Sequence, residues 1–120
     1  MEWEEREQIK EKYAGGTEYF LYTGPVYPPD TLVILLKAFS HFKKWQQSNM
    51  KLVLAGAVNR KTKQLKEKLA TYRYREDVGI IEDPADETLH ELTAGAYAQI
   101  SIDKPEEELA RHLVALYKER

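Results

Sequence analysis

The sequence predicts an α/β protein built from four strands and the helices that connect them. Short apolar runs rich in aromatic and branched residues alternate with longer segments whose apolar residues recur at spacings of three and four. A glycine, proline or other turn residue follows each apolar run. At 120 residues, the chain has the length of one domain. We therefore expect one domain, residues 1–120, with an N-terminal helix and linker in residues 1–17 and four βα units in residues 18–120.

The N-terminal segment is predicted to form a short helix. Glu2–Tyr13 alternates acidic and basic residues around the apolar residues Trp3, Ile9 and Tyr13, which is a weakly amphipathic pattern. The glycine pair Gly15–Gly16 ends the pattern. We expect this helix to lie at the edge of the domain.

The first βα unit has the clearest pattern in the chain. Glu18–Thr23 is almost entirely apolar and rich in aromatic residues, which is typical of a strand buried on both faces. A turn follows that contains Pro28 and Pro29, and the predicted helix then begins near Asp30 and ends near Gln47. Its predicted inward residues are Leu32, Leu35, Leu36, Phe39 and Phe42.

Three further units follow the same plan. The predicted strands are Met50–Ala55, Val78–Ile81 and Ala96–Ile102. The predicted helices are Lys61–Tyr72, capped by Asn59, then Asp86–Ala94, and a last helix that opens at Asp103 and continues to the C-terminus. Because strands and helices alternate, the sheet should be parallel with right-handed crossovers. The expected strand order is 3-2-1-4, which is half of a Rossmann arrangement, with helices on both faces.

A sheet of this kind has two edges, and the strand Val78–Ile81 is predicted to form one of them. An edge strand presents unpaired backbone groups that can pair with a second chain. We therefore expect a homodimer through the exposed sheet edges.

Composition excludes several classes of function. The net charge of −2 provides no field that attracts nucleic acid or an anionic membrane. The chain has no cysteine, so it has neither a disulfide framework nor a thiolate metal site. It also has no run of about 18 apolar residues, and its charged start differs from a signal peptide, so a cytoplasmic location is expected. The histidines His41, His90 and His112 fall on three different helices, so we expect no metal site and no cofactor.

The candidate binding residues follow the predicted strands. Gly24 and Pro25 follow the first strand, Gly56 follows the second, and Glu82 and Asp83 follow the third. Ligands of open α/β sheets bind at the carboxyl ends of the strands, so these residues are candidates for a nucleotide-sugar site in which the acids contact a ribose. The same residues also suit ordinary turns and helix caps. The sequence leaves both interpretations open.

A second candidate surface is basic. Lysines recur through the third predicted helix, and two arginines flank them. The simplest interpretation is a solvated helix surface, and the alternative is a modest anion-binding patch. The residues of this surface are Arg60, Lys61, Lys63, Lys66, Lys68 and Arg73.

Several segments, in their order and spacing, resemble the C-terminal domain of the group 1 (family 4) glycosyltransferases. The resemblance covers roughly residues 13–98 and lies in Tyr19–Gly24, Leu35–Phe39, Met50–Gly56, Asp77–Val78 and Ala94–Ala98. That family has the GT-B fold of two Rossmann-like domains. The resemblance implies that a nucleotide-sugar donor would lie at the carboxyl ends of the strands.

The chain departs from the family at two places. The family carries a basic pair in the first turn, where this chain has Pro28–Thr31, so a diphosphate there would meet the Asp30 carboxylate. The family's Glu-Gly-Phe-Gly-like segment is also absent, because Gln99–Asp103 continues directly into Pro105 and the last helix. We therefore expect a truncated or degenerate nucleotide-sugar-binding domain that is inactive on its own. The alternative is a non-catalytic or engineered α/β scaffold or interaction module with no ligand.

Overall fold

The computed structural model describes residues 3–27 and 29–119 and contains one parallel sheet of four strands. The strands are β1 (Tyr19–Thr23), β2 (Lys51–Gly56), β3 (Val78–Glu82) and β4 (Ala98–Gln99), and their order in the sheet is β3-β2-β1-β4. The predicted class, the parallel sheet and the strand order are confirmed. The predicted positions Glu2, Pro28 and Arg120 lie outside the described residues.

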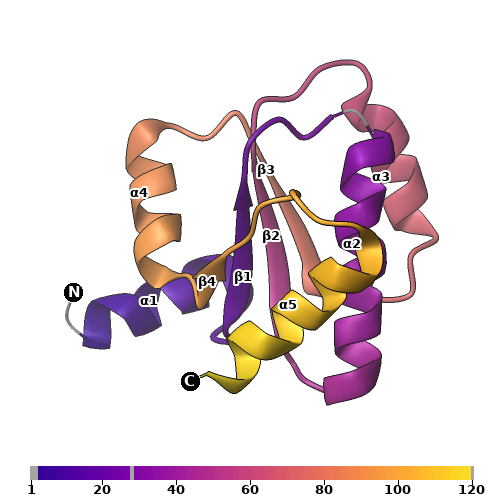
Figure 1. Cartoon of the computed structure of the whole chain (residues 1–120). Helices are drawn as coiled ribbons and strands as arrows, with labels where there is room; N and C mark the ends of the chain where they lie inside the picture. The colour runs from indigo at the N-terminus through magenta and orange to yellow at the C-terminus, as the bar shows by residue number, and fades with distance from the viewer. Residues whose placement is uncertain (1–2, 28, 120) are drawn as a thin grey trace.

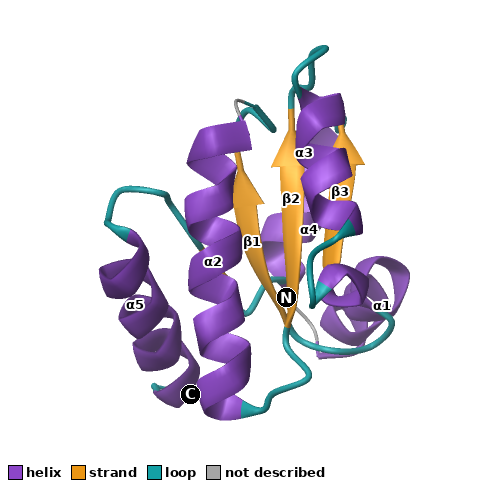
Figure 2. Cartoon of the chain, turned by 90° about the vertical axis from the view of Figure 1, so that its right-hand side faces the viewer, coloured by secondary structure: helices purple, strands orange, loops and turns teal. Residues whose placement is uncertain are grey.

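Helices cover both faces of the sheet, as the sequence predicts. Figures 1 and 2 show α2, α3 and α5 on one face and α1 and α4 on the other. A short 3-10 helix, η1, precedes β3. The bounds are α1 Trp3–Ala14, α2 Pro29–Gln46, α3 Thr62–Ala70, η1 Arg75–Asp77, α4 Asp86–Gly95 and α5 Glu106–Lys118. The larger core lies beneath the face covered by α2, α3 and α5.

Alternation along β1 divides its side chains between the two cores. Phe20 joins the larger core, whereas Tyr19 and Leu21 join the smaller core under α1 and α4. All of the predicted inward residues of α2 are buried in the larger core, because their spacing places them on one side of the helix. These residues are Leu32, Leu35, Leu36, Phe39 and Phe42.

The structure corrects the last strand and three helix starts or ends. The fourth strand was predicted over residues 96–102 but contains only Ala98–Gln99. The strand is short because it pairs only with Phe20 and Leu21. The amide of Gly24, just after β1, donates its hydrogen bond to Ala55 of β2 instead. Ile100 donates one further backbone bond to Leu21 and is buried, after which the chain leaves the sheet.

The helix caps also differ from the prediction. Asn59 does not cap α3, because its side chain accepts a hydrogen bond from the Lys61 amide before the helix begins at Thr62. The last helix begins at Glu106 rather than near Asp103, with the backbone of the preceding proline still extended. Tyr72 lies just beyond the end of α3, although its ring packs against the larger core.

A network of charges attaches α1 to the start of β1. The carboxylate of Glu18 accepts two hydrogen bonds from the guanidinium group of Arg6, one of them at 2.9 Å. It accepts a third from the ammonium group of Lys10 at 2.8 Å. Lys10 is 7% exposed and also pairs with Glu7. Burial raises the pKa of Glu18, but the hydrogen bonds and positive charges of Arg6 and Lys10 outweigh it, so the net shift is downward. The network therefore stabilises the folded state while Glu18 is ionised.

We expect Glu18→Gln to lower the free energy of unfolding by about 1 to 2 kcal/mol at neutral pH, because Arg6 and Lys10 lose a charged acceptor. Since the folded-state pKa of Glu18 lies below its ordinary value of 4.5, the contribution is present above pH 4.5 and is lost as the pH falls through the folded-state value. Urea unfolding of both proteins across this range measures the difference. The exposed control Glu4→Gln should follow the wild type at every pH, and a Glu18→Gln difference that persisted in acid would contradict this mechanism.

Candidate functional site

The structure brings the predicted site residues to one edge of the sheet. Gly24 follows β1, and its amide donates to β2 at a distance of 3.0 Å. Gly56 and Glu82 are paired in the register of β2 and β3. Asp83 follows Glu82 and donates its amide to the carbonyl of Gly56 at 2.9 Å. Pro25 follows Gly24, so all five predicted residues lie at the carboxyl edge of the sheet.

The two glycines are needed for a close approach of the first two strands. A Cβ atom on Gly56 would lie 1.7 Å from the carbonyl oxygen of Gly24, so no side chain fits there. Gly24 itself has a φ of +150°, which L side chains rarely adopt. The conformational and packing role of both glycines is therefore evident without a ligand.

The loop after β1 is filled by its own residues. Val26 is fully buried in the larger core, and its carbonyl accepts a hydrogen bond from the Thr62 hydroxyl at 2.8 Å. Tyr22 donates its hydroxyl to the carbonyl of Pro25 at 2.9 Å. Thr62 is not predicted from the sequence, because its only signal there is its place at the start of a helix. These contacts hold Pro25 and Val26 in place.

The acids of this edge have different surroundings. Glu82 is paired with Lys66 of α3 at 2.9 Å, and both side chains are about half exposed. Asp83 is exposed and has a φ of +43°, in the left-handed region that aspartate tolerates better than most residues. Asp30 is exposed in the first turn of α2. Carboxylates of this kind can accept hydrogen bonds from hydroxyl groups, but they repel phosphate.

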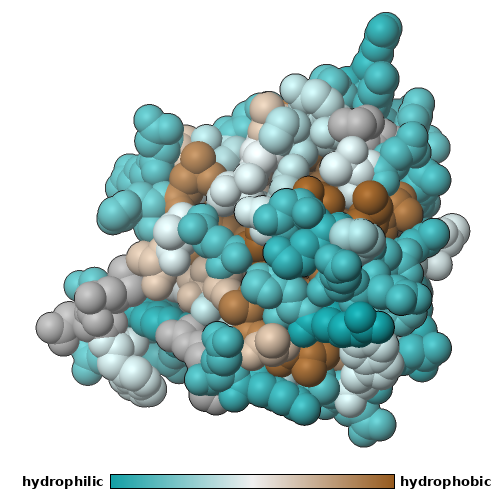
Figure 3. Space-filling view, in the orientation of Figure 1, coloured by the Kyte–Doolittle hydropathy of each residue, from teal (hydrophilic) through white to brown (hydrophobic). Residues whose placement is uncertain are grey.

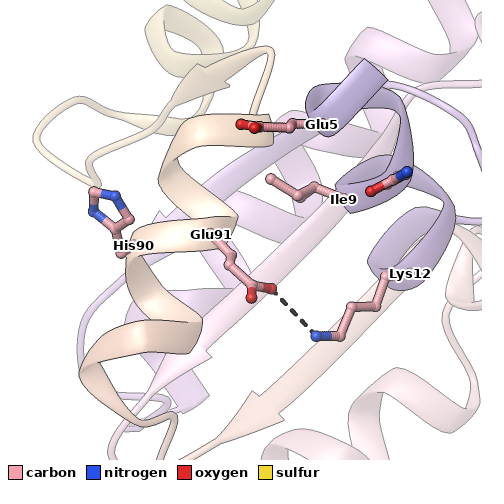
Figure 4. A pocket seen from close by; sticks show the side chains of 6 residues that line it. Glu5, Ile9, Lys12, His90 and Glu91 are labelled. Carbon is pink, nitrogen blue, oxygen red and sulfur yellow. Dashed lines mark hydrogen bonds and ion pairs between the residues drawn. The ribbon is translucent and has the colours of Figure 1, made fainter. Parts of the chain in front are cut away.

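A groove of about 420 Å³ lies between α1 and α4, away from the predicted site residues (Figure 4). Ile9 and His90 line it, and Lys12 pairs with Glu91 across it at 3.3 Å. Tyr13 also donates its hydroxyl to Glu91 at 2.8 Å, which lowers the pKa of that carboxyl together with Lys12. The charges of this groove are therefore largely satisfied within the protein.

The two most buried lysines hold elements together. Lys10 belongs to the network around Glu18. Lys43, which is 7% exposed, donates to the carbonyls of Ser48 and Met50 and pairs with Asp77 at 3.1 Å. It thus connects the end of α2 with the start of β2 and with η1. All of these contacts are structural, because the ammonium group is surrounded by partners from the protein.

Within residues 3–27 and 29–119, no group of three or more histidine, aspartate or glutamate side chains is arranged to hold a metal ion. None of the helices in that part of the chain is both long and apolar enough to cross a membrane. No protein-family model matches the sequence. A search of curated proteins also found no match.

Proposed function

We propose that this chain is a degenerate nucleotide-sugar-binding domain of the glycosyltransferase type, which neither transfers a sugar nor holds a nucleotide sugar at its carboxyl edge at micromolar concentration. The proposal combines the resemblance of the strands and helices with the local structure of the carboxyl edge. Its proposed location is the cytosol, since a chain without cysteine gains nothing from an oxidising compartment.

The observation that carries the proposal is the use of the backbone amides at this edge. Gly24, Val26 and Asp83 donate their amides to carbonyls of neighbouring segments at 3.0, 2.8 and 2.9 Å. A diphosphate at the edge of such a sheet accepts hydrogen bonds from free backbone amides. These three amides are already committed, and Pro25 has none to offer.

Charge supports the same conclusion. The exposed carboxylates of Asp30 and Asp83 lie on segments that follow β1 and β3, and Lys66 is paired with Glu82 at the end of β3. A diphosphate beside these two segments would be repelled by their carboxylates, whereas the exposed cations Arg60 and Lys61 are carried by the segment that follows β2. Repulsion at partly buried distances costs several times more than it does in bulk water.

The test is an NMR titration of the full chain with uridine and guanosine diphosphate sugars. We expect the amide signals of Gly24, Gly56 and Asp83 to stay in place at micromolar ligand, because their surroundings are filled by the protein. Saturable shifts of these three signals at micromolar concentration would overturn the proposal. A ligand that shifts only signals elsewhere in the chain would leave the carboxyl edge unoccupied, as proposed.

The alternative candidate is an interaction module that forms a homodimer through a sheet edge. It is favoured by β3, an edge strand whose Gly79 is exposed and has open space where a side chain would be. The face seen in Figure 3 is mostly hydrophilic, with hydrophobic residues in small separate patches. Sedimentation of the titration samples separates the candidates, because a monomer at high concentration contradicts the dimer.

A further inference from the structure

A basic groove lies on the outer surface between α2 and α3, the two neighbouring helices in the foreground of Figure 2. Its volume is about 340 Å³. The residues come from α2, from the end of α3 and from the segment that follows α3. They are Val33, Leu36, Lys37, Lys68, Thr71, Tyr72 and Arg73. None of the residues predicted for nucleotide-sugar binding belongs to this groove.

The groove concentrates positive charge in a chain that is acidic overall. Lys37, Lys68 and Arg73 line it, and no carboxylate does. None of the three forms an ion pair with a residue that the structure describes. Lys66, on the same helix, differs because it is paired with Glu82. The three cations of the groove therefore keep their full attraction for an anion from solution.

The floor of the groove is apolar and fixed in position. Leu36 is 4% exposed, and the ring of Tyr72 lies beside it. The Tyr72 hydroxyl donates to the carbonyl of Leu36 at 2.5 Å and accepts a hydrogen bond from Ser40 at 2.9 Å. Burial raises the pKa of Tyr72 to about 12, so the hydroxyl keeps its proton and these bonds at neutral pH. The bond between Tyr72 and Leu36 thus joins α2, which carries Lys37, to the segment after α3, which carries Arg73.

The remaining polar groups suit the same kind of ligand. The guanidinium carbon of Arg73 lies 5.4 Å from the centre of the Tyr74 ring. This contact limits the orientations of the guanidinium group. A guanidinium group can donate two parallel hydrogen bonds to a phosphate, and a lysine ammonium adds a point charge.

We propose that this groove binds a small soluble phosphate anion with at least two negative charges, such as a diphosphate or a phosphate monoester. Arg73 holds the phosphate through its planar donors, and Lys37 and Lys68 neutralise the remaining charge. The small volume and the convergence of cations from three segments favour a compact anion. This site is independent of the carboxyl edge, so its failure would leave the proposed function unchanged.

The test is an NMR titration of the full chain with inorganic pyrophosphate at low ionic strength. We expect saturable shifts at Leu36, Thr71 and Arg73. The triple variant K37Q/K68Q/R73Q should weaken binding at least about tenfold, because it removes every cation that lines the groove. The matched triple variant K44Q/R111Q/K118Q removes the same charge from exposed positions outside the groove and should bind within about twofold of the wild type.

Three results would overturn the proposal. One is the absence of saturable shifts at the groove. Another is an equal loss of binding in both triple variants, which would indicate only a general attraction of charge. The last is binding to phosphatidic acid vesicles without binding of pyrophosphate, because a membrane surface would then replace the soluble anion.

Discussion

Gly56→Ala is expected to lower the free energy of unfolding by about 3 kcal/mol, at the upper end of the usual cost of overpacking. The added Cβ would lie 1.7 Å from the carbonyl oxygen and 2.6 Å from the carbonyl carbon of Gly24. Both atoms belong to the backbone, so rotation of a side chain cannot relieve the contact. The end of β2 would have to separate from the first turn, which would break the bond from the Gly24 amide to β2. Urea unfolding followed by circular dichroism measures the loss.

Gly79→Ala is the matched control, because Gly79 also lies in a strand of this sheet. No atom lies within 4 Å of the position of its added Cβ. We expect this variant to unfold within about 0.5 kcal/mol of the wild type. Equal stability of Gly56→Ala and Gly79→Ala would contradict the close approach of β2 to the turn after β1.

Phe42→Ala should lower the free energy of unfolding by about 3 to 5 kcal/mol, since it removes a large buried ring and leaves a cavity. The ring is fully buried on α2. Its centroid lies 5.2 Å from that of Phe20 on β1 and 5.3 Å from that of Tyr117 on α5. It therefore joins the sheet, α2 and α5, and its loss would loosen α5 most. Denaturant unfolding and the protection of α5 amides from hydrogen exchange measure both effects.

Two further variants keep this prediction testable if Phe42→Ala is too unstable to purify. Phe42→Leu should cost less than about 1.5 kcal/mol, because it keeps most of the buried volume. Trp45→Ala removes a side chain from the same helix that is 53% exposed, and it should cost less than about 1 kcal/mol. A Trp45→Ala effect as large as that of Phe42→Ala would contradict the assignment of the inward face of α2.

The candidate site was predictable in position but not in chemistry. The location of Gly24, Gly56 and Glu82 at one edge follows from the parallel order of the strands, because consecutive strands then end on the same side. The use of the nearby amides does not follow from the sequence. It depends on how far β2 and the turn after β1 approach one another, which is set by packing across the whole sheet.

The surface groove shows the same division. The lysine-rich helix is evident from the sequence, but its pattern groups Lys66 with Lys68, which the structure separates. Lys66 faces Glu82 of β3, whereas Lys68 lies with Lys37 of α2 at the groove. Helical spacing alone cannot decide which lysine has a partner, because the partners come from other elements of the chain.

The fold class, the strand order and the inward face of α2 were predictable from the sequence. Those features follow from local periodicity and from the constraint that short right-handed crossovers place on parallel strands. The short length of β4, the contacts of the turn after β1 and the network around Glu18 became evident only in the folded chain. Each of these depends on contacts between distant residues, such as the bond from Thr62 to Val26 across 36 positions, and a pattern within one segment carries no record of its partner.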